Sequence, residues 1–90
     1  MSLAEYIARA NAALIKRHGI CFITDENTSW LGDSGADESD LARYQADGDT
    51  PEQIAAFWGD KYGLDSVFGD FDSMASDYLA KALSALEVAA

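Results

Sequence analysis

The sequence has little cysteine, histidine, proline or basic side chain, and each shortage excludes a class of structure. The single cysteine, Cys21, cannot form a disulfide within the chain. One histidine, His18, added to one cysteine leaves too few ligands for a zinc site. Six lysines and arginines among 90 residues are too few for the basic footprint of a direct nucleic-acid binder. One proline leaves no proline-rich linker.

Long apolar runs are also missing. No stretch approaches the roughly 18 apolar residues of a membrane-spanning helix, and Met1 to Ala10 lacks the pattern of a signal peptide. An unpaired cysteine is typical of a reducing compartment. We therefore expect a cytoplasmic protein. We also expect no membrane partner, because a net charge of −10 is repelled by anionic lipid. The 49% of hydrophobic residues predicts one small folded domain over residues 1–90.

The acidic excess is concentrated in the middle of the chain. Residues 25–77 hold fourteen of the sixteen acids and only two bases, Arg43 and Lys61. Eleven of these fourteen acids are aspartates, which carry charge close to the backbone and lose little side-chain entropy when held. We expect any electrostatic function to lie in this segment.

Capping residues and apolar periodicity predict four helices. Ser2 and Glu5 form a capping-box pair, and Gly19 is a typical helix stop. Thr50-Pro51-Glu52-Gln53 combines a capping threonine, a proline at the first helical position and a glutamine three residues after the cap. We expect helices at residues 3–18, at 40–47 after a cap at Asp37 or Ser39, at 51–62, and from Asp70 or Asp72 to about residue 88.

Between the first two helices, β-favouring residues predict a hairpin. The runs 20–24 and 28–31 flank the turn residues Asp25-Glu26-Asn27. Phe22 and Trp30 would form the apolar face that packs on the helices, since an isolated hairpin is only marginally stable. The predicted fold class is α+β and mostly helical: an N-terminal helix, a short β-hairpin, two short helices and a C-terminal helix in one compact domain.

No motif in the sequence predicts catalysis or metal binding. His18 and Cys21 are the one possible nucleophilic pair, but they fit a helix-end histidine and a buried small residue better. An EF-hand loop starting at Asp25 fails, because Trp30 replaces the required glycine and Ala36 the terminal glutamate. We expect a protein that is not an enzyme and has no catalytic residue, metal or cofactor.

Two Asp-Ser pairs resemble the start of the serine-bearing helix in acyl carrier proteins. They are Asp33-Ser34 and Asp65-Ser66. The resemblance implies a serine that opens an apolar helix, but Ser34 is followed by Gly-Ala-Asp-Glu-Ser-Asp. Ser66 has only 24 residues after it, too few for the remaining helices of that fold. An acyl-carrier-like protein is therefore a remote alternative.

The acidic middle carries the functional hypothesis. Carboxylates at a phosphate-like spacing can occupy a cleft for nucleic acid, because the lysines and arginines of that cleft pair with them instead of phosphates. The candidate partner-binding residues are Asp33, Asp37, Glu38, Asp40, Asp47 and Asp49.

In size, charge and lack of catalytic groups, the chain resembles small acidic proteins of phages and mobile elements. Residues 40–64 are similar to a module common in such proteins, with the order helix, glycine, Thr-Pro-Glu, helix, Lys-Tyr-x-Leu. That class includes anti-CRISPR proteins and DNA-mimic antirestriction proteins. The resemblance implies a non-catalytic inhibitor that occupies a basic nucleic-acid-binding site of a bacterial defence complex, either a CRISPR effector or a restriction enzyme. We expect a monomer rather than a homodimer, in the cytoplasm of the host cell.

A different class of function is an accessory or assembly module. Such a module would bind a protein partner, or a second copy of itself, through an apolar helix face. The residues that would form this face are Trp30, Trp58, Tyr78, Leu83 and Leu86. In a domain of this size, the same residues also fit an ordinary core.

Overall fold

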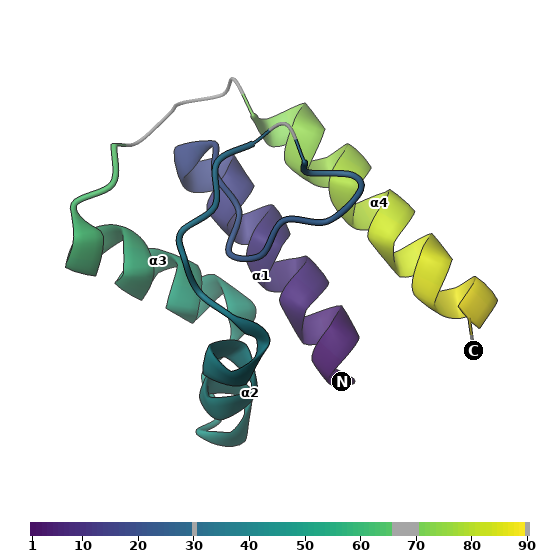
Figure 1. The fold of residues 1–90 in the computed structure, drawn as a ribbon, viewed down its shortest axis with the longest axis horizontal. Coiled ribbons are helices and arrows are strands. Elements are labelled where there is room, and N and C mark those ends of the chain that lie inside the picture. Colours follow the sequence, from purple (N-terminus) through teal and green to yellow (C-terminus); the bar gives the residue numbers. More distant parts are fainter. Residues whose placement is uncertain (30, 66–70, 90) are drawn as a thin grey trace.

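The computed structural model describes residues 1–29, 31–65 and 71–89, and every regular element in that part of the chain is a helix (Figure 1). The helices are α1 (Leu3–His18), α2 (Glu38–Ala46), α3 (Pro51–Tyr62) and α4 (Asp72–Ala89). The described residues therefore form an all-helical domain, and the predicted α+β class is wrong.

The helix ends agree with the local signals in the sequence. Ser2 Oγ accepts a hydrogen bond from the N–H of Glu5 at 3.1 Å, and Gly19 ends α1 in the left-handed conformation. The Glu5 carboxylate pairs with Arg9 at 3.1 Å, so only the serine half of the predicted capping box is formed. At the start of α3, Thr50 and Gln53 cap each other reciprocally at 2.8 and 3.1 Å. For α2 the cap is Asp37. The earlier of the two alternative starts of α4, Asp70, lies outside the described residues.

The predicted hairpin over residues 20–31 is wrong. Cys21 instead forms an isolated parallel bridge with Asp33. The N–H of Cys21 donates to the carbonyl of Gly32 at 3.1 Å, and Ser34 N–H donates to the carbonyl of Cys21 at 2.9 Å. Trp30, expected on the apolar face of the hairpin, lies outside the described residues.

A side chain of α1 takes the hydrogen bonds that a second strand would need. Asn11 Oδ1 accepts from the backbone N–H groups of Phe22 and Ile23 at 2.9 and 3.1 Å. Its amide nitrogen donates to the carbonyl of Ile23 at 3.0 Å. The backbone at residues 22–23 is thus paired with a helix side chain, so the segment packs as a loop across α1 and α4 (Figure 1).

Helix α1 is the centre of the fold. Figure 1 shows α3 on one side of α1 and α4 on the other, and both pack against it, as does α2. Because it is covered from several directions, α1 is buried on more than one face. Its buried residues are Tyr6, Ala8, Ala10, Asn11, Ala12, Leu14 and Ile15.

The core consists of two clusters on either side of α1. The cluster toward α2 and α3 includes Leu14, Phe22, Leu41 and Trp58. The cluster toward α4 comprises Ala12, Ile15, Cys21, Ala75 and Tyr78. Two residues of the predicted assembly face, Trp58 and Tyr78, are only 7% and 5% exposed and belong to these clusters.

Candidate functional site

Several aspartates of the acidic segment hydrogen-bond to backbone close to them in sequence. Oδ1 of Asp25 accepts from the N–H of Asn27 at 2.8 Å, and Oδ1 of Asp33 accepts from the N–H of Gly35 at 3.0 Å. These are turns closed by an aspartate side chain, a geometry that the longer glutamate does not favour. Part of the preference for aspartate therefore has a structural cause.

Asp37 and Asp40 form the capping box of α2. Oδ1 of Asp37 accepts from the N–H of Asp40 at 3.0 Å, and Oδ2 of Asp40 accepts from the N–H of Asp37 at 3.1 Å. The Ser39 hydroxyl donates to Asp37 at 2.6 Å; this bond and the capping bond hold the pKa of Asp37 below its usual value. Asp40 also pairs with Arg43 at 3.2 Å. Charge reversal at Asp37 or Asp40 would therefore disrupt the helix start as well as the surface charge.

The other three candidate residues have exposed side chains that are not used in this way. Glu38 is the first residue of α2, and Asp47 and Asp49 lie between α2 and α3. Asp49 is anchored through its backbone, since its carbonyl accepts from the Tyr6 hydroxyl at 2.6 Å. The ion pairs found among the described residues, Arg9–Glu5 and Arg43–Asp40, involve none of these three carboxylates.

The structure thus divides the six candidate residues between the two ends of α2. Asp33, Asp37, Glu38 and Asp40 lie before or within its first turn, while Asp47 and Asp49 follow its last residue. The nine residues of α2 span roughly 13 Å, so the two groups lie about one and a half Debye lengths apart at physiological salt. They therefore form two separate acidic groups, one at each end of α2.

A groove of about 340 Å³ lies between the first half of α1 and the second half of α4, beside the loop that follows α1. Its apolar lining includes Ile7 and Ala8 from α1 and Ala85 and Leu86 from α4. All the charged residues that line it are acidic: Asp25, Glu26 and Glu38. Glu38 is the only one of the six candidate residues in this groove.

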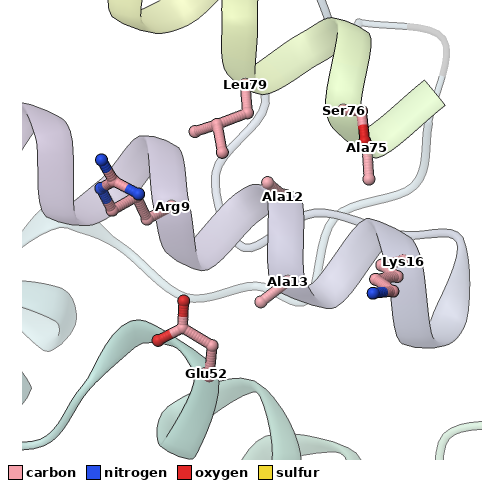
Figure 2. Close-up of a pocket in the computed structure, with 8 residues that line it drawn as sticks. All are labelled: Arg9, Ala12, Ala13, Lys16, Glu52, Ala75, Ser76 and Leu79. Carbon is pink, nitrogen blue, oxygen red and sulfur yellow. The ribbon is translucent and has the colours of Figure 1, made fainter. Parts of the chain in front are cut away.

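A second pocket, of about 220 Å³, lies between α1, α4 and the start of α3 (Figure 2). In Figure 2, Arg9 and Lys16 lie along α1 on either side of small alanines, and Glu52 faces them from α3. Arg9 is already paired with Glu5 at 3.1 Å. The charged groups of this pocket, Arg9, Lys16 and Glu52, do not converge on one point where they could bind a ligand together.

Exposed aromatic side chains form a third surface on α2 and α3. Phe57 and Tyr62 are 50% and 54% exposed, and the ring of Phe57 lies 6.5 Å from that of Tyr44. The Lys61 ammonium lies 5.6 Å from the Phe57 ring centroid and 5.3 Å from that of Tyr62, within cation–π range. The assembly face predicted from the sequence contains neither Phe57 nor Tyr62. Helical periodicity alone does not show which aromatic residues of α3 the core has room for.

The His18 and Cys21 side chains have separate surroundings. Nδ1 of His18 donates to the carbonyl of Asp65 at 2.9 Å, and its ring packs on Gly59. Cys21 is fully buried, and its Sγ lies 3.7 Å from the carbonyl oxygen of Gly32. Burial raises the pKa of the Cys21 thiol, which keeps it protonated rather than reactive at neutral pH.

Metal-holding clusters and membrane-spanning helices are both absent from residues 1–29, 31–65 and 71–89. No three histidine, cysteine, aspartate or glutamate side chains of this part gather in a way that could hold a metal ion. None of its helices is both long enough and apolar enough to cross a membrane. Ser66, one of the two serines in the acyl-carrier alternative, lies outside the described residues.

Comparison of the chain with protein-family models, with curated proteins and with solved structures gave no match in any of the three.

Proposed function

We propose that this protein is a non-catalytic inhibitor that binds, through its acidic surface, a basic nucleic-acid-binding site of a bacterial defence complex. The partner classes are a CRISPR effector and a restriction enzyme. Inhibition requires no reaction by this chain, because occupying the site with carboxylates is enough to exclude nucleic acid. We propose further that it acts in the cytoplasm and as a monomer.

The observation that carries this proposal is the set of uncompensated carboxylates at the two ends of α2. Glu38, Asp47 and Asp49 are exposed and belong to neither of the ion pairs found among the described residues. Each ion pair joins neighbours within a single helix, so neither reduces the charge elsewhere on the surface. Carboxylates within each of the two groups repel one another, and a basic partner would remove that repulsion on binding.

Charge also favours the speed that an inhibitor needs. Attraction between this surface and a basic cleft steers the two proteins together and raises the association rate. Binding would release counterions from both surfaces, so the affinity falls as the salt concentration rises. A strong salt dependence is therefore a required property of the proposed complex.

The proposal is tested by affinity capture from a bacterial lysate with the whole chain as bait. At about 50 mM salt we expect the bait to retain a basic nucleic-acid-handling protein, and at about 500 mM salt to lose most of it, at least about tenfold. Mass spectrometry identifies the partner. Retention of a metabolic enzyme instead, or a yield that does not change with salt, would contradict the proposal.

The assembly module remains a second candidate, now favoured by different residues. The half-exposed Phe57 and Tyr62 form an apolar face of the kind found at protein interfaces. Trp58 and Tyr78, by contrast, are buried in the core, and Leu83 and Leu86 are half-buried. Sedimentation of the free protein separates the two candidates, because a dimer that persists at both salt concentrations would support the module.

A further inference from the structure

We propose that the groove between α1 and α4, with its acidic rim, binds an amphipathic helix that carries basic residues beside an apolar stripe. This inference rests on the proposed function, since it names the structural element of the basic partner that this protein would hold.

The floor of the groove is shallow and apolar. Ala4 and Ala8 are one turn apart on α1, and Ala82 and Ala85 are one turn apart on α4. Small side chains at these positions allow the backbone of a third helix to approach both helices closely. Packed helices lie about 8–10 Å apart, and alanines favour the short end of that range.

The rim of the groove is acidic, and one of its carboxylates, that of Asp25, is held in place by hydrogen bonds. Its charged members are Asp25, Glu26 and Glu38, and no basic residue is among the lining residues. The Tyr78 hydroxyl donates to Oδ2 of Asp25 at 3.0 Å, and the Asn27 N–H donates to Oδ1 at 2.8 Å. A carboxylate fixed before binding loses little entropy on pairing, so it favours lysine or arginine at one edge of an incoming helix.

Other occupants fit this groove less well. A second copy of this chain would bring another net charge of −10 against an acidic rim. An extended peptide commonly binds by adding a strand to the open edge of a sheet. The walls of this groove are the helices α1 and α4, which offer no such edge. A small organic cation is normally held by several aromatic faces, and Tyr78 is the one aromatic residue of the lining.

The test uses a synthetic 18-residue helical peptide with leucines at positions i, i+3, i+4 and i+7 and lysines flanking that stripe. A scrambled peptide of the same composition keeps the charge but loses the stripe. Binding is measured by calorimetry at low salt, and perturbed backbone amides are mapped by NMR. We expect perturbation centred on Ala4, Ala8, Ala82 and Ala85, and at least about tenfold weaker binding of the scrambled peptide.

A matched pair of variants tests the groove without changing the charge: one fills the groove, and the other is its control. Ala85→Trp fills the groove, whereas Ala80→Trp adds the same side chain at another exposed position of α4 outside its lining. We expect Ala85→Trp to weaken peptide binding at least about tenfold and Ala80→Trp to leave it within about twofold. Equal effects of the two variants, or equal binding of the two peptides, would overturn the inference.

The same pair separates failure of this inference from failure of the proposed function. If an Ala85→Trp bait still retains the basic partner from lysate as well as the Ala80→Trp bait, the groove is not the binding site but the acidic inhibitor stands. If the wild-type bait retains no basic protein, the proposed function itself fails. Thermal unfolding of both variants checks that each remains folded.

Discussion

Replacing Asn11 by alanine is expected to lower the free energy of unfolding by about 3 kcal/mol, the sum of several lost buried hydrogen bonds. Asn11 is 1% exposed, and its carboxamide reaches the backbone of Phe22 and Ile23 and the hydroxyl of Tyr78. Alanine would remove the side-chain partner of the backbone groups at Phe22 and Ile23, while the Tyr78 hydroxyl would keep its bond to Asp25. A domain of this kind has about 5–15 kcal/mol of stability, so the loss is a large share.

Urea unfolding, followed by circular dichroism, measures this effect. Asn27→Ala is the matched control, because Asn27 is exposed and its own bond to Asp25 is made by the backbone N–H. We expect the control to change stability by less than about 0.5 kcal/mol. A loss below about 1 kcal/mol in Asn11→Ala would show that Asn11 does not hold α1, α4 and the intervening loop together.

Replacing Gly19 by alanine is expected to destabilise the fold by about 2–4 kcal/mol, the sum of two effects. The first is backbone strain, because Gly19 has φ +71°, in the left-handed region that alanine disfavours. The second is overpacking, because a Cβ at this position would lie 2.8 Å from Cε2 of Phe71. Gly19 thus ends α1 and also gives the start of α4 room to approach.

The glycine that ends α3 separates these two effects. Gly63 has φ +60°, and a Cβ there would meet nothing within 4 Å. Gly63→Ala therefore carries the backbone strain without the collision, and we expect it to cost about 1–2 kcal/mol less than Gly19→Ala. Adding Phe71→Ala to Gly19→Ala tests the same point in reverse: the double variant should lose less than the two single losses combined. Equal losses at the two glycines would contradict the contact with Phe71.

Local chemistry predicted the helices, while the error in fold class came from a contact distant in sequence. Ser2, Gly19 and Thr50 act within one turn of their own helix, so their effect can be read from neighbouring residues. The hairpin failed because Asn11, on the preceding helix, takes the backbone groups of residues 22–23. No spacing in the sequence shows that an asparagine on α1 faces that loop.

The candidate site was predictable only in part for the same reason. The charge pattern located the acidic segment, and the Asp37-x-x-Asp40 spacing contains the capping signal that gives those two carboxylates a structural role. The groove has no such signal. It brings Glu38 together with Ala4 and Ala85, residues from near the two ends of the chain, and that arrangement depends on how α4 packs on α1.

The most direct measurement for the central claim compares three baits for the amount of basic partner that they retain at low salt. The baits are the wild type, Asp47→Lys/Asp49→Lys and Asp77→Lys/Glu87→Lys. Both double variants change the net charge equally, and all four positions are exposed. Lysine near the end of α2 also suits the helix dipole, so Asp47→Lys should not weaken the fold.

We predict that Asp47→Lys/Asp49→Lys lowers retention of the basic partner at least about tenfold, because it places positive charge against the basic partner at one of the two proposed contact points. Retention by Asp77→Lys/Glu87→Lys should stay within about threefold of the wild type, because this variant weakens only the long-range attraction between the two proteins. Equal retention by all three baits would contradict the account, and equal loss in both variants would show that net charge, rather than the surface at α2, determines binding.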